Sequence, residues 1–191
     1  MVRTRVGYTG GSSANPTYTN LGSHTEAIQI DYDPALISYE SLLESFWDSH
    51  DSVSPSWSRQ YRKAVFYHNE KQRTAAEGSL KKIVSVIGDK VITEIEPFTE
   101  FYLAEGYHQK HRLRGHYAVL REFEEIYPEI KGLISSTAAA RINGYLGGYG
   151  TCEQLNEEIS RFGLSASGSK ILLDEVCLGN MERTCSDRGC I

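Results

Sequence analysis

Residues 7–34 read GYTGGSSANPTYTNLGSHTEAIQIDYDP, and this stretch decides the fold of the N-terminal half. It starts with a turn rich in glycine, serine and asparagine, and the segment from His24 to Tyr32 then alternates with the period of a β-strand. Glu26 and Ile28 share one side of that strand, and its apolar members predict that this side faces a core. Because an ionised carboxyl group is poorly solvated there, we expect burial to raise the pKa of Glu26 and make it a proton donor.

The flanking segments predict alternating strands and helices up to about residue 97. We expect strands over residues 1–8, 24–32, 64–67 and 92–95, and helices that begin after Ser38 and Asn69, the second ending at Ile87 before Gly88. Beyond residue 105 the chain is expected to be mostly helical, with a capping box formed by Thr151 and Gln154. A short helix over residues 171–177 and a mobile tail should complete it.

Length and composition indicate one domain with a short appendage. The chain has 191 residues, of which 40% are hydrophobic and 24% charged, so it can build a core. We expect a domain over residues 1–165, followed over residues 166–191 by the short helix and a cysteine-bearing tail. The net charge of −5 argues against a nucleic-acid partner, and neither a membrane-spanning apolar run nor a signal peptide is evident.

Cysteine usage indicates a reducing compartment. Three of the four cysteines lie close to the C-terminus, which does not suggest a disulfide framework for a chain of this size. We therefore expect a cytoplasmic protein. The histidines His108, His111 and His116 have the spacing of one helix face without further ligands nearby, so no metal site is expected.

Several motifs together resemble the peptide methionine sulfoxide reductase A family. Residues 7–34 carry the first, Arg59-Gln60-Tyr61-Arg62 the second, and FYLAEGYHQK at residues 101–110 the third, in the order and at the spacings of that family. Residues 136–145 resemble one branch of it. The resemblance implies an oxidoreductase that reduces methionine S-sulfoxide in proteins, repairing oxidative damage.

The same resemblance implies a fold, and it implies that residues 1–191 lack the first βα unit of that fold. Family members have a ferredoxin-like split βαββαβ arrangement, an α+β two-layer sandwich followed by C-terminal helices. Here the first βα unit is absent, and with it the Gly-Cys-Phe-Trp motif that carries the nucleophilic cysteine and the aromatic pair for the substrate methyl group. Loss of a central strand should expose two strand edges and an apolar face, so we expect low stability of residues 1–191.

Three residues match the family's catalytic groups. Glu26 matches the glutamate that protonates the departing oxygen, and Tyr18 and Tyr61 match the tyrosines that hydrogen-bond the sulfoxide oxygen. The alternative for Glu26 is a buried carboxylate paired with a neighbouring arginine or tyrosine. Trp57 lies in the loop before Tyr61, where it either forms an aromatic wall or packs on its own helix.

The cysteines are candidates for redox steps. Cys185 and Cys190 lie in a C-terminal segment like the one in which family members carry recycling cysteines, although unrelated exposed thiols would look the same. Cys152 and Cys177 complete the set from which a substitute nucleophile could come. The resemblance implies no bound cofactor, an external reductant such as thioredoxin or dithiothreitol, a monomer, and oxidised proteins or free methionine sulfoxide as partners.

A second hypothesis follows from the missing nucleophile. The chain would then be a catalytically inactive relative or fragment that binds peptides with oxidised methionine, or a protein partner. Glu26, Tyr18 and Tyr61 could still hold a sulfoxide oxygen in such a protein.

Overall fold

The structure is a computed structural model that describes residues 2–88 and 90–188, with side chains up to residue 178. The described residues form two compact units. Unit 1 comprises Val6–Glu105, and unit 2 comprises Val2–Arg5 with the described residues from Gly106 onward. The division thus falls at residue 105, inside the segment expected as one domain.

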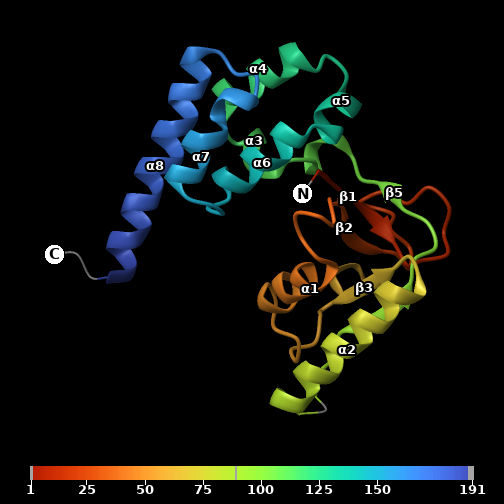
Figure 1. Cartoon of the computed structure of the whole chain (residues 1–191). Coiled ribbons are helices and arrows are strands. Elements are labelled where there is room, and N and C mark those ends of the chain that lie inside the picture. The colour runs from red at the N-terminus through yellow and green to blue at the C-terminus, as the bar shows by residue number, and fades with distance from the viewer. Residues whose placement is uncertain (1, 89, 189–191) are drawn as a thin grey trace. The chain divides into compact units, whose positions relative to one another are not determined.

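Unit 1 has two small sheets and two α-helices (Figure 1). Its elements are the part of β1 (Arg3–Thr9) from Val6 onward, β2 (Thr25–Asp31), α1 (Tyr39–Asp48), the 3-10 helix η1 (Arg59–Tyr61), β3 (Ala64–Tyr67), α2 (Glu70–Ile87), β4 (Glu94–Pro97) and β5 (Tyr102–Leu103). One sheet has the order β2-β1-β5, with β1 and β5 antiparallel. The other pairs β3 with β4 in parallel, so β3, α2 and β4 form a βαβ unit.

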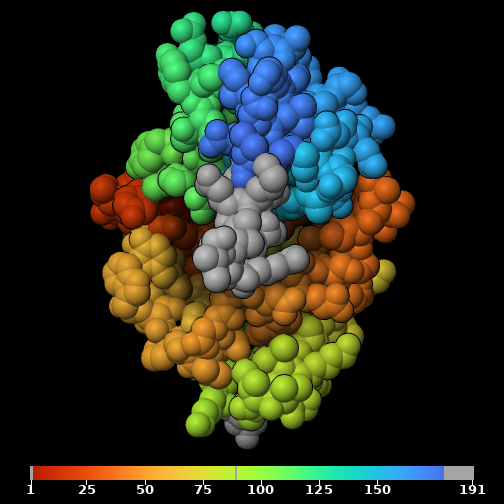
Figure 2. All heavy atoms as spheres, turned by 90° about the vertical axis from the view of Figure 1, so that its left-hand side faces the viewer, coloured from red at the N-terminus to blue at the C-terminus, as the bar shows by residue number. Residues whose placement is uncertain are grey.

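The mixed α/β class is confirmed, and so are the helix ends in unit 1. Ser38 caps α1 by accepting a hydrogen bond from Ser41 N, and Asn69 caps α2 by accepting one from Gln72 N. Gly88 ends α2 with a φ of 86°, a conformation that glycine adopts without strain. The orange side chains around α1 adjoin the yellow-green side chains of α2 in Figure 2, and the two helices are in contact.

The last strand of the βαβ unit differs from the prediction. β4 begins at Glu94 rather than at residue 92, and it continues beyond residue 95 to include Pro97. Pro97 pairs with Tyr67 at the end of the ladder, where no donor is required of the proline. The following residue supplies the donor, because Phe98 N donates to Tyr67 O over 2.8 Å.

The faces of β2 are the reverse of those predicted. Thr25 is buried, with 2% of its surface exposed, whereas Ile28 on the expected core side is 58% exposed. Thr25 is buried because its side chain is used in polar contacts: Oγ1 donates to Arg59 O over 3.2 Å and accepts from Arg62 Nε over 2.6 Å. A hydrogen-bond network, rather than an apolar core, therefore covers this side of the strand.

Unit 2 is helical, as expected. Its helices are α3 (His111–Arg114), α4 (Tyr117–Ile126), α5 (Ile130–Ser135), α6 (Thr137–Leu146), α7 (Cys152–Glu158) and α8 (Ala166–Arg188), with 3-10 helices η2 (Gly106–His108) and η3 (Ile159–Arg161). Thr151 and Gln154 form the predicted capping box of α7. The core gathers residues from several helices: Leu113, Phe123, Ile142, Leu155 and Leu172 are all fully buried.

The C-terminal segment differs from the prediction in the length of its helix and in the backbone of its tail. The predicted short helix over residues 171–177 is part of α8, which runs from Ala166 to Arg188, so the backbone is helical where a mobile tail was expected.

Packing of α7 against α8 brings Cys152 and Cys177 to a Cα separation of 5.1 Å, and they form a disulfide. Sequence spacing gave no signal for it, because the partners are 25 residues apart.

No helix within residues 2–88 and 90–188 has both the length and the apolar content needed to cross a membrane.

We expect the disulfide to stabilise unit 2. A cross-link that closes a loop of this length stabilises a protein by about 3 kcal/mol, mainly by restricting the unfolded chain. The double substitution Cys152→Ser with Cys177→Ser should therefore lower the urea midpoint followed by circular dichroism. Dithiothreitol should lower the midpoint of the unsubstituted chain equally and leave that of the variant unchanged. Equal midpoints for both proteins without reductant would contradict this assignment.

We expect unit 1 to unfold at lower urea concentration than unit 2. Among the described strands β2 pairs only with β1 and β3 only with β4, and such open edges leave backbone groups unpaired. Both tryptophans of the chain, Trp47 and Trp57, lie in unit 1, so their fluorescence reports this unit. Far-ultraviolet circular dichroism mainly follows the helices of unit 2. Coincident transitions by the two probes would show that the units unfold together.

Candidate functional site

The glycine-rich turn before β2 is held by a buried histidine. His24 is 2% exposed, its Nδ1 accepts from Gly11 N over 3.2 Å, and its Nε2 donates to Ser13 O over 2.8 Å. Both contacts require the neutral ring with the proton on Nε2, because a carbonyl oxygen only accepts and an amide only donates. A Cβ atom at Gly11 would lie 2.5 Å from the ring of His24, so only glycine fits there.

Glu105 anchors the far end of the same turn. Its Oε1 accepts from Tyr18 N over 3.0 Å, while its Oε2 accepts from the hydroxyl of Tyr8 over 2.6 Å. Tyr8 is fully buried in β1. One carboxylate therefore fixes the backbone of Tyr18 relative to the sheet.

Gln60 connects the predicted catalytic residues Glu26 and Tyr61 by hydrogen bonds. The hydroxyl groups of Tyr18 and Tyr61 lie 3.2 Å apart, and Gln60 Nε2 donates to Tyr61 over 3.2 Å and to Glu26 Oε1 over 2.6 Å. Three segments contribute: the turn carries Tyr18, β2 carries Glu26, and η1 carries Gln60 with Tyr61. We call Tyr18, Glu26, Gln60 and Tyr61 the oxygen-binding cluster.

Arg62 fixes η1 to both sheets. Its side chain is only 7% exposed, and Nε donates to Thr25 in β2. Nη1 and Nη2 hold the two carboxylate oxygens of Glu96 in β4 at 2.5 and 2.8 Å, and Nη1 also contacts Glu94. The hydrogen bonds from Arg62 lower the pKa of Glu96. This bidentate contact places Gln60 and Tyr61 against Glu26.

The surroundings of Glu26 differ from the prediction. Glu26 is exposed in the described residues, so the expected apolar burial of its carboxyl group is wrong for this structure. Glu26 and Ile28 instead line a pocket of about 520 Å³. The side of β2 on which they lie is therefore open.

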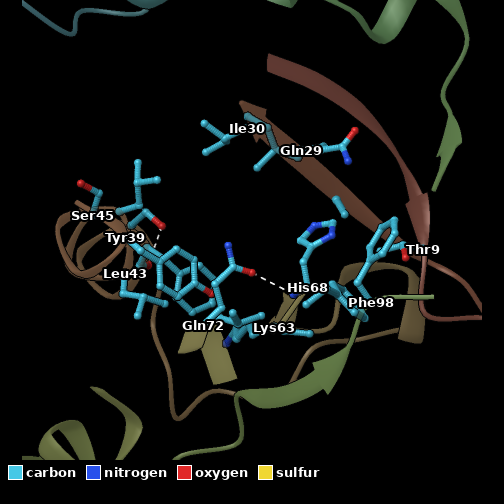
Figure 3. Close-up of a pocket in the computed structure, with 18 of the residues that line it drawn as sticks. Thr9, Gln29, Ile30, Tyr39, Leu43, Ser45, Lys63, His68, Gln72 and Phe98 are labelled. Carbon is cyan, nitrogen blue, oxygen red and sulfur yellow. Dashed lines mark hydrogen bonds between the residues drawn. The ribbon is translucent and has the colours of Figure 1, made fainter. Parts of the chain in front are cut away.

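The pocket is lined by β2, β3 and α1, and on this side neither β2 nor β3 pairs with another strand of the described residues. Figure 3 shows Gln29 and Ile30 of β2 on one side of the opening and Lys63, which precedes β3, on the other. Apolar side chains of α1, of β3 and of the residue after β4 dominate the rest of its wall, among them Leu42, Leu43, Phe46, Val65, Phe66 and Phe98. The opening thus combines free strand edges with an apolar wall, as sites for an added β-strand do.

The phenol of Tyr61 stays protonated over the physiological range. The hydrogen bond with Tyr18, burial and the nearby charge of Glu26 together raise the pKa of Tyr61 to about 12. Tyr61 can consequently donate a hydrogen bond to a substrate oxygen at any pH at which proteins work.

The predicted redox residues lie elsewhere. Residues 6–105 contain no cysteine. Cys152 and Cys177 of unit 2 are bonded to each other, Cys190 lies outside the described residues, and the side chain of Cys185 does too. Within the part of the chain that the structure describes, no group of three or more histidine, cysteine, aspartate or glutamate side chains is placed to hold a metal ion.

Sequence comparison identifies the family. Residues 1–141 match the family described as "Peptide methionine sulfoxide reductase". The chain belongs to this family. A peptide methionine sulfoxide reductase of Drosophila melanogaster is 41% identical over 167 residues, which cover 86% of this chain and 67% of the relative. Peptide methionine sulfoxide reductase A5 of Arabidopsis thaliana is 37% identical over 151 residues, covering 76% of this chain and 59% of the relative.

A third relative and a solved structure agree with this assignment. Peptide methionine sulfoxide reductase MsrA of Methanosarcina acetivorans is 40% identical over 122 residues, covering 58% of this chain and 65% of the relative. The crystal structure of reduced Mxr1 from Saccharomyces cerevisiae matches with 26% identity and a TM-score of 0.50, over 55% of this chain and 66% of that one. The chain therefore spans about 59 to 67% of the length of these three sequence relatives.

The prediction missed three residues that position this reductase-family site. Gln60 and Arg62 stood in the motif that singled out Tyr61, but their partners in β2 and β4 are at least 32 positions away in sequence. Glu105 stood in the third motif. In each case the motif marked the segment, while the hydrogen-bond partner became evident only in the folded chain.

We expect the pKa of Tyr61 to depend on Tyr18. The substitution Tyr18→Phe removes the hydrogen bond that contributes most to the raised pKa, so Tyr61 should ionise at lower pH. Phenolate absorbance can be titrated in the unsubstituted chain and in Tyr18→Phe, with Tyr61→Phe and the double variant used to subtract the other tyrosines. Tyr149→Phe, at an exposed position in unit 2, is the matched control. An unchanged Tyr61 titration in Tyr18→Phe would show that the two hydroxyl groups do not interact in solution.

Proposed function

We propose that this chain is a peptide-methionine (S)-S-oxide reductase that returns methionine S-sulfoxide in proteins to methionine. The observation that carries the proposal is the oxygen-binding cluster, in which a carboxyl group and two phenol groups from three separate segments converge. Tyr18 and Tyr61 would hold the sulfoxide oxygen, and Glu26 would protonate it.

The reaction requires a thiolate in addition to this cluster. The thiolate attacks the sulfoxide sulfur, the S–O bond of the substrate breaks, and the oxygen forms a bond to the cysteine sulfur, so that the sulfoxide is reduced to a thioether and the cysteine is oxidised to a sulfenic acid. The proton from Glu26 goes to the transferred oxygen. A second thiol then condenses with the sulfenic acid, water leaves, and an external dithiol reduces the resulting disulfide.

Because residues 6–105 contain no cysteine, the attacking thiolate of this proposal comes from outside unit 1. The family resemblance places it in a Gly-Cys-Phe-Trp segment at the end of a strand. The pocket between β2 and β3 supports such an arrangement, since its two free edges and apolar walls suit one further strand. A strand there would also cover the side of β2 that carries Glu26 and Ile28, and would complete the split βαββαβ order.

The resemblance supports the remaining parts of the proposal. The reductant would be thioredoxin in the cell or dithiothreitol in an assay, with no bound cofactor. The partners would be oxidised proteins or free methionine sulfoxide, and the enzyme would be a cytoplasmic monomer.

The test is reduction of the separate S and R sulfoxides of N-acetylmethionine with dithiothreitol. Two proteins are compared: residues 1–191, and the same chain preceded by a strand that ends in the Gly-Cys-Phe-Trp segment that the family resemblance implies. We expect S-selective turnover by the fusion. Turnover by residues 1–191 alone would mean that one of its own cysteines attacks, and single serine substitutions would identify it.

Glu26→Gln in the active protein should lower kcat by roughly 10²- to 10⁴-fold, the range of general acid catalysis. Glu44→Gln changes an exposed carboxyl group of α1 and should leave kcat unaltered. Equal activity of Glu26→Gln and the unsubstituted protein would exclude Glu26 as the acid, and absence of turnover by every protein would contradict the proposed function.

A further inference from the structure

The side-chain amide of Gln60 makes two hydrogen bonds with its single nitrogen. Nε2 donates to Glu26 Oε1 over 2.6 Å and to the hydroxyl oxygen of Tyr61 over 3.2 Å. An amide nitrogen carries two protons and accepts no hydrogen bond, so each of the two contacts uses one proton. One side chain thus reaches both the carboxyl group and a phenol group of the oxygen-binding cluster.

The fold holds residue 60 between two anchored arginines. Arg59 Nε donates to Ser23 O over 2.8 Å, and Arg59 O accepts from Thr25 Oγ1 over 3.2 Å. Arg62 anchors the other end of η1, since its Nε also donates to Thr25 Oγ1. The backbone of η1 is therefore fixed along the start of β2, and the side chain of Gln60 meets this strand.

The ring of Tyr61 is held in place as well. Trp57, whose side chain is 82% exposed, packs on this ring with the centroids 4.6 Å apart and the planes inclined by 40°, so the tryptophan packs on the 3-10 helix that follows it. Ser56 Oγ donates to Tyr61 O over 2.7 Å. The phenol oxygen thus has a defined position, in which it accepts from Gln60 and lies 3.2 Å from the hydroxyl oxygen of Tyr18.

The donor at residue 60 decides where the phenol proton of Tyr61 points. A phenol has one proton to donate, and its oxygen can also accept. Because the Tyr61 oxygen accepts from Gln60, the Tyr61 proton points away from residue 60 and can go to Tyr18 or to a ligand oxygen. An acceptor at residue 60 would draw that proton to itself.

The same amide decides which oxygen of Glu26 carries a proton. An ionised carboxylate only accepts, so the nitrogen of the Gln60 amide, rather than its oxygen, faces Glu26. When Glu26 is protonated, Oε1 keeps this contact as the carbonyl oxygen, and the proton then lies on Oε2. Oε2 accepts no hydrogen bond from the described residues, and Glu26 lines the open pocket. The acidic proton is therefore on the oxygen that a ligand can approach.

We infer that Gln60 is a positioning residue that sets the proton positions of the site: it keeps the acidic proton on Glu26 Oε2 and directs the Tyr61 proton away from residue 60, toward the sulfoxide oxygen. The inference rests on the proposed function, in which Glu26 protonates that oxygen. Gln60 acts through Glu26 and Tyr61, and the property that it must supply is its pair of N–H donors.

Nuclear magnetic resonance of residues 1–191 tests the two hydrogen bonds without substrate. The side-chain amide signals of Gln60 are assigned by their loss in Gln60→Met. Glu26→Leu should move mainly the signal of the proton that faces the carboxylate, and Tyr61→Phe mainly that of the other proton, because each variant removes one acceptor. Glu44→Leu, at an exposed position of α1, is the matched control and should move neither. Signals that respond to neither Glu26→Leu nor Tyr61→Phe would overturn the inference and leave the proposed function standing.

Kinetics of the active protein in the sulfoxide assay test the role itself. Gln60→Glu keeps the shape of the side chain but makes it an acceptor when ionised, and Gln60→Met keeps its length without polar hydrogens. Both should lower kcat by roughly 10- to 100-fold and change KM less, because proton placement matters most as the S–O bond breaks. Gln154→Glu is the matched control: its Oε1 only accepts, from Thr151 N over 3.0 Å, so both constants should stay unaltered.

The outcomes separate this inference from the proposed function. A space-filling role of Gln60 would leave Gln60→Glu fully active, so unaltered kcat in this variant and in Gln60→Met, with reduced kcat in Glu26→Gln, would overturn the inference alone. Absence of turnover by the unsubstituted active protein would overturn the inference together with the proposed function.

Discussion

The arrangement of unit 1 depends on the guanidinium of Arg62. It donates hydrogen bonds to Thr25 in β2 and to both carboxylate oxygens of Glu96 in β4. It also donates one to Glu94. β2 belongs to one sheet of unit 1 and β4 belongs to the other, and the two sheets share no strand. Arginine suits this task because its planar fork offers donors in several fixed directions and keeps its charge when buried. Its contacts act together with the hydrogen bonds that Thr25 and Glu26 of β2 make with Arg59 and Gln60 of η1.

The oxygen-binding cluster follows from this constraint together with a second one. Arg62 places Gln60 and Tyr61, and Glu105 fixes the backbone of Tyr18 against the fully buried Tyr8. Gln60 then joins Glu26 to Tyr61. Each group is polar and partly accessible, so the site is held by charge-assisted and shared hydrogen bonds rather than by core packing.

The two units are stabilised in different ways. Unit 2 has a continuous apolar core, and the Cys152–Cys177 disulfide joins α7 to α8. Unit 1 has short strands with free edges beside an apolar pocket, and its buried apolar cluster is small, consisting of Tyr8, Leu21 and Ala104. The unit that carries the candidate site is therefore the one whose sheets and apolar surface would gain most from a further strand.

The sequence by itself determined the helix ends, which depend on interactions between residues close together in the chain. Ser38, Asn69, Gly88 and the Thr151 capping box marked helix ends correctly, because a cap is satisfied within a few residues. Motifs also named three residues of the cluster, Tyr18, Glu26 and Tyr61. Only the tertiary structure decided which face of β2 is covered, how far α8 extends, which cysteines pair, and that Gln60 links Glu26 to Tyr61. These features depend on partners distant in sequence, and alternation or spacing along a strand cannot show which neighbour covers a face.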